Sequence, residues 1–481
     1  MKNIRNLNIQ FALFLACFIL SAFQVKSQSK KPNILFIAID DLRPQLNVYG
    51  HNQMITPNLD ALASEGRLFK NHYVQVPTCG PSRAVMLTGK NLKSKAEIQH
   101  HHLGKTLARE SEPNAPETYI HHLKKHGYYT VGMGKISHSI SGKRKKSYEL
   151  PYSWDAFISN KDGYQMYANG EKRDKTKTPP FEMLDVSDET YPDGRVAQLA
   201  INELEKRKAS DTPFYMAVGF LRPHLPFSAP KKYWDLYDRK EIPLSPNPDA
   251  PIGVADEFLH GSSEFFGQYY SPERGGSRKR ISDAYAKKVI HANFGSVSYV
   301  DAQVGKVLDK LKQLNLDENT IVIVWGDHGW HLGDQTIWGK HSSFENALKS
   351  TFIVKTPKMK KAGVQTESLV AAVDIYPTIC ELAKVPRPNG IDGKSFVSII
   401  KNPKKRTREA TLSYWRDIIS MRTERYRLAV FNNGKKQEIM LFDHIIDPNE
   451  TINIANKNPD IVTELWPQLI KLNKGYLPNL K

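Results

Sequence analysis

The chain has 481 residues, a formal net charge of +18 at pH 7 and three cysteines. This length and low cysteine content exclude a small fold that depends on disulfide bonds. The composition, with 40% hydrophobic and 25% charged residues, excludes a disordered chain. The charge arises from 68 lysines and arginines against 50 acidic residues, which favours polyanionic partners. A chain of this size is expected to form one large domain with an appendage or several smaller units.

The first 27 residues have the pattern of a cleavable signal peptide. Lys2 and Arg5 form a basic start, an apolar run follows at residues 11–23, and residues 25–27 (VKS) offer a cleavage site. Cleavage would remove three basic residues and Cys17, which lowers the net charge from +18 to +15. We therefore expect an exported protein, in a bacterial periplasm or outside the cell rather than in a lysosome. Lipoprotein anchoring through Cys17 is the alternative.

Five apolar runs separated by helical patterns predict an α/β fold. The first run, Asn33–Ile39 (NILFIAI), is typical of a central strand that is covered on both faces. Thr56 and Pro57 then start a helix that reaches Gly66. The other predicted strands are residues 128–133, 214–220, 320–325 and 351–354, with helical patterns near residues 117–126, 195–208 and 284–314. This alternation indicates a doubly wound, mostly parallel sheet.

The sequence pattern changes towards the C-terminus. Short segments at residues 412–415, 420–423, 427–430 and 438–442 predict an antiparallel sheet, and a helix is expected around residues 459–472. After the signal peptide at residues 1–27, we expect an α/β domain at residues 28–395 and a smaller α+β subdomain at residues 396–481. Two polar, turn-rich segments, residues 139–180 and 243–280, are expected to run over the surface.

Acidic residues follow two of the predicted strands directly. Asp40 and Asp41 come after the first strand, and Asp327 with His328 comes after residues 320–325. Ligands of open α/β sheets bind outside the carboxyl ends of the strands, so both clusters are expected at one edge. Carboxylates held close together need a compensating charge, and a hard divalent cation is the simplest one. The alternative is that each aspartate caps a helix.

Cys79 lies in residues 77–83 (PTCGPSR), where a short helix is expected to begin. Such a turn would present the cysteine side chain and the helix amides to an anion, and Arg83 would add positive charge. The alternative is a buried free thiol, which is the usual state of a single cysteine. These residues by themselves leave both interpretations open.

The segment from Cys79 to Arg83 (CGPSR), followed by LTG at residues 87–89, resembles the Cys-x-Pro-Ser-Arg signature of type I sulfatases. In that family the cysteine is oxidised to formylglycine. The resemblance extends from about Lys31 to the C-terminus and includes residues 374–378 (DIYPT), 390–393 (GIDG), 441–443 (LFD) and 447–448 (DP). Four parts of the sequence resemble the iduronate-2-sulfatase branch of the family in particular: residues 38–44 (AIDDLRP), Gly134-Lys135 with His138, residues 222–227 (RPHLPF) and residues 327–330 (DHGW).

The resemblance implies an alkaline phosphatase-like fold, in which helices enclose a large mixed, mostly parallel sheet and the C-terminal subdomain carries an antiparallel sheet. It also implies one metal ion, expected to be calcium, with five ligands: Asp40, Asp41, Asp327, His328 and the oxygen of the converted residue 79. Because calcium prefers oxygen, His328 leaves the identity of the metal open. The charge of the sulfate would be neutralised by Arg83, Lys135 and Lys340.

The family also implies a mechanism that explains the cysteine. Hydrated formylglycine is a geminal diol, and one hydroxyl attacks sulfur with the help of Asp327 and the metal to give an enzyme-bound sulfate ester. His224 and Lys340 would protonate the departing sugar oxygen. His138 would then deprotonate the second hydroxyl, so that sulfate is expelled and the aldehyde returns. An ordinary serine or cysteine ester lacks this route.

The sequence thus predicts an exported sulfuric ester hydrolase that acts on a sulfated saccharide, with a 2-O-sulfated uronate or a related polysaccharide unit as the suggested substrate. A formylglycine-generating enzyme is the expected partner during maturation. Neither nucleic acid nor, after signal cleavage, a membrane is expected as a partner. The alternative enzyme is a phosphomonoester or phosphonate ester hydrolase of the same superfamily. A non-catalytic protein that binds sulfated glycans is the alternative of a different class.

Other features have simpler interpretations. The basic run at residues 142–146 and the histidines at residues 100–102 are expected in polar loops. Trp330 and Trp338 flank the predicted site and fit equally a sugar-stacking role and core packing. Cys380 is expected to pack in the helix that follows Asp374.

Overall fold

The computed structural model describes residues 31–98, 117–138, 150, 152–158, 166–477 and 480. The predicted signal peptide with Cys17, the histidines at residues 100–102 and the basic run at residues 142–146 lie outside the described residues. Among the helices that are described, none is both long and apolar enough to cross a membrane.

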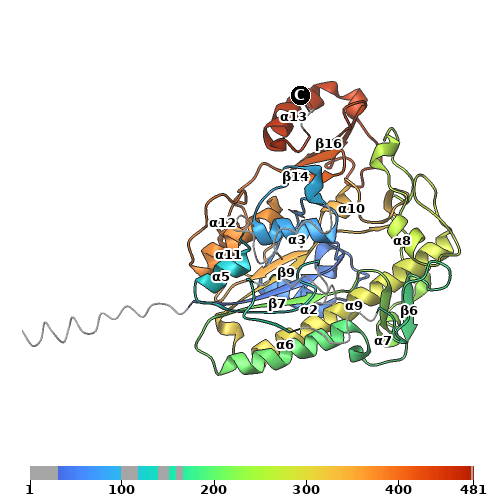
Figure 1. Cartoon of the computed structure of the whole chain (residues 1–481). Helices are drawn as coiled ribbons and strands as arrows, with labels where there is room; N and C mark the ends of the chain where they lie inside the picture. Colours follow the sequence, from blue (N-terminus) through green and yellow to red (C-terminus); the bar gives the residue numbers. More distant parts are fainter. Residues whose placement is uncertain are drawn as a thin grey trace, which may run out of the picture.

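A mixed sheet of seven strands, in the order β2-β12-β9-β1-β7-β4-β5, forms the centre of the α/β part (Figure 1). The strands are β1 (Asn33–Ile39), β2 (Arg67–Leu68), β4 (Tyr129–Gly134), β5 (Ala156–Ile158), β7 (Phe214–Phe220), β9 (Thr320–Gly326) and β12 (Phe352–Lys355). β1 pairs in parallel with β7 and β9, and β4 pairs in parallel with β7 and β5. β12 runs antiparallel to β9 and β2. The predicted mixed, mostly parallel sheet is confirmed.

Helices cover both faces of this sheet (Figure 1). One face carries α2 (Pro57–Glu65), α6 (Pro192–Lys208) and α9 (Asp283–Gln313), and the other carries α3 (Cys79–Thr88), α5 (Tyr119–Lys125), α11 (Ile375–Ala383) and α12 (Val397–Lys401). The helices predicted from the sequence are all present. Two of them begin at a capping hydroxyl: Thr118 accepts a hydrogen bond from the His121 amide at the start of α5, and Ser282 accepts one from the Tyr285 amide at the start of α9. The predicted packing of Cys380 is also found, because this residue is buried in α11.

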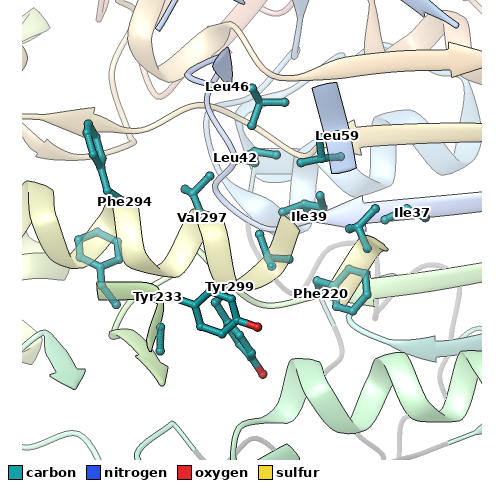
Figure 2. Close-up of a cluster of buried hydrophobic side chains, with 14 of the residues drawn as sticks. Ile37, Ile39, Leu42, Leu46, Leu59, Phe220, Tyr233, Phe294, Val297 and Tyr299 are labelled. Atoms are coloured by element: carbon teal, nitrogen blue, oxygen red, sulfur yellow. The ribbon is translucent and has the colours of Figure 1, made fainter. Parts of the chain in front are cut away.

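The side chains of β1 alternate between two cores. Leu35, Ile37 and Ile39 belong to the cluster with α2, α6 and α9, whereas Ile34, Phe36 and Ala38 belong to the cluster on the other face. Figure 2 shows Ile37 and Ile39 together with Phe220 of β7 and Val297 and Tyr299 of α9. Each fully buried side chain of this kind contributes about 1.5–3 kcal/mol, so a change of register would be costly. The packing of β1 therefore fixes the position of Asp40, which follows it.

A second sheet near the C-terminus contains β14 (Ala410–Trp415), β15 (Ile418–Thr423), β16 (Tyr426–Asn432) and β17 (Gln437–Asp443), with antiparallel neighbours throughout. The helix α13 (Pro459–Asn473) follows it. One apolar cluster joins Leu412 and Leu428 of this sheet to Val85 of α3. The predicted C-terminal antiparallel sheet is confirmed, whereas the domain boundary between residues 395 and 396 stays a prediction.

Shorter elements complete the described fold. β3 (His72–Tyr73) pairs with β13 (Val370–Ala371), β6 (Phe181–Leu184) with β8 (Phe227–Pro230), and β10 (His331–Leu332) with β11 (Trp338–Gly339). The short helices are α7 (Lys231–Trp234), α8 (Ser263–Gln268) and α10 (Glu345–Leu348). The prediction that residues 243–280 run over the surface is only partly correct. Helix α8 lies in this segment and buries Glu264, Phe265 and Phe266.

Candidate active site

Charged residues from several strands meet at the carboxyl ends of the parallel strands. Asp40 and Asp41 follow β1, Asp327 follows β9, and Lys135 follows β4. β9, β1, β7 and β4 are consecutive parallel strands of the sheet, so these residues share one edge. The Asp41 amide donates a hydrogen bond of 3.0 Å to Asp327 Oδ1. Asp41 has a φ of 62°, a left-handed conformation that aspartate tolerates better than most residues.

Two glycines allow Lys135 to reach this edge. A Cβ atom at Gly134, whose φ is +70°, would lie 2.0 Å from the Gly219 carbonyl oxygen. A Cβ atom at Gly219 would in turn lie 2.2 Å from the Lys135 carbonyl oxygen. Larger residues would therefore force β4 and β7 apart at their ends. The close approach positions Lys135, whose Nζ atom forms a buried ion pair with Asp40.

Cys79 begins helix α3 and lies among these charged groups. Its Sγ atom is 3.3 Å from His328 Nε2 and 3.4 Å from Lys340 Nζ. Burial raises the pKa of the Cys79 thiol, and the negative charge of Asp40 raises it further, in spite of the nearby lysines. A thiol with a raised pKa is a weak nucleophile, because the thiolate is the reactive form. The unmodified side chain is therefore poorly suited to attack an ester.

Arg83, one turn further along α3, fixes two of the carboxylates. Its Nε atom donates to Asp327 Oδ2 at 2.9 Å, and a terminal nitrogen lies 3.3 Å from Asp40 Oδ1. The same guanidinium group donates to the carbonyl oxygens of Lys135 and Ile136. Arg83 is fully buried, and these four hydrogen bonds use four of its five N–H donors. It adds positive charge to the site while it holds Asp40 and Asp327 in place.

The site contains residues that could hold a metal ion. One ligand atom from each of Asp40, Cys79, Asp327 and His328 lies within 4.8 Å of the others, and Asp41 Oδ1 lies 3.2 Å from His328 Nε2. His328 Nδ1 lies 3.0 Å from the Gly329 carbonyl oxygen, which only accepts, so Nδ1 carries a proton. Nε2 is then the nitrogen that faces the carboxylates and would bind a metal, the arrangement found in metal-binding histidines. Three carboxylates and one imidazole nitrogen fit a divalent cation.

The carboxylates of Asp40 and Asp41 lie in different electrostatic surroundings. Burial would raise the pKa of Asp40, but the charges of Lys135, His224 and Arg83 outweigh it and hold the pKa well below its usual range. For Asp41, burial dominates and raises the pKa, although Lys340 opposes it. Lys340 Nζ lies 2.9 Å from Asp41 Oδ1, and the pKa of this lysine is well above its ordinary value. The site therefore keeps its cations in the protonated form.

His224 lies on the loop between β7 and β8 and faces a carboxylate that the sequence did not reveal. Its Nδ1 atom donates to the Leu225 carbonyl oxygen at 2.6 Å, and its Nε2 atom lies 3.4 Å from Glu264 Oε1. Burial would lower the pKa of His224, but the charges of Asp41 and Asp40 raise it to about 10. Glu264 is one acidic residue in a polar segment, and no motif marks it.

A further group of possible metal ligands contains Glu345, His444 and Glu450. Arg427 forms ion pairs with both of these glutamates. Because the carboxylates already have a buried cationic partner, we assign this group to the packing of α10 against the C-terminal sheet.

The sequence profile of the family described as Sulfatase matches residues 32–385. The chain belongs to the sulfatase family. A second profile, described as N-sulphoglucosamine sulphohydrolase, C-terminal, matches residues 326–475. An iduronate 2-sulfatase of Mus musculus is 31% identical over 431 residues, which cover 79% of this chain and 74% of the relative. The predicted family is confirmed, and this sulfatase is a sulfuric ester hydrolase.

Solved structures agree with this fold. A protein in complex with its substrate D-glucosamine-2-N,6-O-disulfate has a TM-score of 0.72 at 22% identity, covering 94% of the sulfatase and 99% of that chain. A phosphonate monoester hydrolase of Silicibacter pomeroyi has a TM-score of 0.71 at 21% identity. The match covers 92% of the sulfatase and 94% of that chain. At these identities the likeness concerns the fold alone, so it does not separate sulfate from phosphonate ester hydrolysis.

The remaining predicted residues of the sulfatase have mixed outcomes. Trp330 and Trp338 are 1% and 2% exposed and belong to the main hydrophobic core, so the core-packing interpretation is correct and the sugar-stacking one is wrong. His138 is half-buried three residues after Lys135, and its role as a base stays a prediction.

A half-buried tryptophan from the C-terminal sheet, Trp415, stacks on His341 with ring centroids 4.7 Å apart. The C-terminal sheet thus contacts the residue next to Lys340.

Proposed function

We propose that this sulfatase is exported and hydrolyses sulfate esters of a sulfated saccharide, using formylglycine at position 79 and one calcium ion. The observation that carries the proposal is the position of Cys79 Sγ, 3.3 Å from His328 and 3.4 Å from Lys340. The side chain of residue 79 is thereby in contact with both the candidate metal ligands and a buried cation. Formylglycine, when hydrated, supplies a hydroxyl nucleophile that the protonated thiol does not offer.

The substrate class is supported by the relatives and by charge. One relative is named iduronate 2-sulfatase, and one protein of the same fold was solved with a disulfated glucosamine. The net charge, +18 for the full chain and +15 after the proposed signal cleavage, favours an anionic polymer or oligosaccharide. We infer that the substrate is a 2-O-sulfated uronate or a related unit of a sulfated polysaccharide.

Asp40, Asp41, Asp327 and His328 would hold the metal together with residue 79. When bound, the ion polarises the sulfate group and stabilises the charge that develops on its oxygens. The chain's own cations Arg83, Lys135 and Lys340 provide further stabilisation, and they do so in a buried site where charges act strongly.

Two histidines handle protons in this proposal. His224 holds a proton on Nε2 and gives it to the departing sugar oxygen, with the ammonium group of Lys340 as a second donor. The carboxylate of Glu264, 3.4 Å from His224 Nε2, supports this role because a nearby negative charge favours the protonated ring. His138 acts as the base that allows sulfate to leave residue 79.

The test is the mass of the peptide that contains residue 79, isolated from the native host, together with an activity assay. Formylglycine should be present in active enzyme, supplied by a formylglycine-generating enzyme during maturation. An unmodified thiol in all copies would remove the nucleophile and favour a protein that binds sulfated glycans without hydrolysing them. Matched sulfate and phosphate esters should be assayed side by side, since a clear preference for phosphate would overturn the proposal in favour of a phosphoester hydrolase.

Export is tested separately. The mature protein, recovered outside the cytoplasm, should begin near residue 28. A mature chain that begins at a lipid-modified Cys17 would instead indicate an anchored lipoprotein.

A further inference from the structure

Helix α8 places a buried carboxylate between two cations of the site. Glu264 Oε1 lies 3.4 Å from His224 Nε2, and Glu264 Oε2 lies 3.5 Å from Lys340 Nζ. The three residues come from three separate segments of the chain, since His224 follows β7, Glu264 belongs to α8 and Lys340 follows β11. Their side chains are 12%, 12% and 2% exposed, so the ion pairs are largely shielded from water.

The position of Glu264 is fixed by its neighbours on the helix. Phe265 and Phe266 are buried in the main core, and the rings of Phe265 and Trp338 lie 5.9 Å apart. A helix anchored in this way cannot easily turn its carboxylate away from the site. Burying a carboxylate is unfavourable unless cations compensate for it, so the arrangement needs both His224 and Lys340.

The two cations depend on Glu264 to different extents. Lys340 has a second anchor, because its Nζ atom lies 2.9 Å from Asp41 Oδ1. The His224 ring is oriented by two contacts, the Nδ1 hydrogen bond to the Leu225 carbonyl and the Nε2 contact with Glu264. Among the described residues, Glu264 is the one carboxylate in an ion pair with His224. Removal of this carboxylate should therefore disturb His224 more than Lys340.

We propose that Glu264 is a positioning residue, which orients the His224 ring so that the Nε2 proton is available to the leaving oxygen of the sulfate ester. The proposal rests on the proposed function. As a new bond forms between the nucleophile and sulfur, the S–O bond to the leaving group breaks, its electron pair stays on the leaving oxygen, and that oxygen takes the Nε2 proton. Glu264 stays ionised throughout. At 3.4 Å the contact is an ion pair outside the usual N–H···O hydrogen-bond range, so Glu264 orients the charged ring without accepting the Nε2 proton that the leaving oxygen takes.

The experiment compares two sulfate esters that differ in their need for a proton. A sugar sulfate has a poor leaving group and needs acid catalysis, whereas 4-nitrophenyl sulfate releases a stabilised phenolate. In the mature, formylglycine-containing enzyme with metal, Glu264→Gln should lower kcat for the sugar sulfate about 100-fold, and lower kcat for the aryl sulfate by no more than about threefold. Equal losses for both esters, or no loss for either, would overturn the inference.

Two more variants distinguish a positioning role of Glu264 from a purely structural one. Glu264→Asp retains the charge and should recover part of the lost kcat for the sugar sulfate, which a purely structural role would not produce. In the double variant with His224→Gln, Glu264→Gln should add little to the loss, since both changes remove the same proton transfer. Additive losses would contradict this.

Glu257→Gln is the matched control, because Glu257 lies in the same segment and pairs with the surface residue Lys436. This variant should keep wild-type kcat on both esters. Thermal unfolding of each variant shows whether the fold is intact, and Glu264→Asp carries the comparison if Glu264→Gln does not fold. Wild-type enzyme without sulfatase activity would count against the proposed function. An active wild type, together with a Glu264→Gln variant that loses kcat equally for both esters, would count against this inference alone.

Discussion

His328 Nε2 lies 3.3 Å from Cys79 Sγ, although 249 positions separate the two residues in the sequence. The contact forms because β9 ends beside β1 and helix α3 begins at the same end of the sheet. The other ring nitrogen of His328 lies 3.0 Å from the Gly329 carbonyl oxygen, so Nε2 is the nitrogen that faces residue 79. Whatever atom residue 79 carries on its Cβ is therefore within reach of the candidate metal ligands.

Replacement of Cys79 by alanine should abolish turnover without unfolding the protein. The side chain supplies the nucleophile after oxidation, and loss of a nucleophile typically costs roughly 10³-fold or more in kcat. The measurement is kcat on a sulfate ester together with the thermal unfolding midpoint. Cys380→Ala is the control, since Cys380 is buried in α11, and this variant should keep its activity. Activity in Cys79→Ala would exclude residue 79 as the source of the nucleophile.

Removal of divalent cations should inactivate the enzyme and lower its stability. Asp40, Asp41 and Asp327 are buried close together, so a bound cation stabilises the folded state. At a calcium concentration 100 times the Kd, the stabilisation is about 2.7 kcal/mol, which is measurable as a rise in unfolding midpoint. Dialysis against a chelator followed by addition of calcium should remove and restore both activity and stability. Full activity in protein shown by elemental analysis to be metal-free would contradict this prediction.

The central strands and the acidic clusters were predictable because their signals are local. Asn33–Ile39 is apolar without interruption, which identifies a strand buried on both faces, and the aspartates that follow it must then lie at the sheet edge. Parallel strands end at one edge, so the same argument brings Asp327 to Asp40. The role of Cys79 depended on the family resemblance, since the residues around it fitted a buried thiol equally well.

Other features depend on tertiary contacts that leave no local pattern. Phe352, Ile353 and Val354 of β12 are apolar whichever way the strand runs, so its antiparallel direction could not be predicted. Trp330 looks like a site residue because it follows the DHG segment, yet its ring is buried in the core. Glu264 meets His224 and Lys340 only after α8 has packed through Phe265.

Lys340→Ala should lower kcat/KM by about 10²–10³-fold. The Lys340 ammonium group lies 2.9 Å from Asp41 and 3.4 Å from Cys79, so it is one of the buried charges available to a bound sulfate. Lys340→Arg should recover little, because the planar guanidinium group does not fit a site built for a compact ammonium. Steady-state kinetics check this, with Lys436→Ala at the surface as the control. A loss of stability with unchanged kcat/KM would show that Lys340 only compensates the negative charge of Asp41.

Glu450→Gln should destabilise the fold through the buried contact between the C-terminal sheet and α10. Glu450 and Arg427 are both fully buried, and Glu450 also accepts a hydrogen bond of 2.7 Å from the Glu345 amide. Loss of the charge leaves Arg427 less well compensated, which typically costs about 3–5 kcal/mol and should lower the urea midpoint. Glu424→Gln, which breaks a surface pair with Arg406, should cost less than about 1 kcal/mol. Equal effects of the two variants would contradict the structural role assigned to Glu450.

The same contact should depend on pH. Burial would raise the pKa of Glu450, but Arg427 and His444 outweigh it, and the pKa lies below the ordinary value of 4.5. The unfolded chain therefore binds a proton at Glu450 before the folded chain does, so acid favours unfolding. The stabilisation by this group is complete well above pH 4.5 and is lost as the pH falls below that value. The urea midpoints of the wild type and of Glu450→Gln should consequently converge as the solution is acidified. A difference in midpoint that stays constant down to low pH would show that the effect arises from packing rather than from charge.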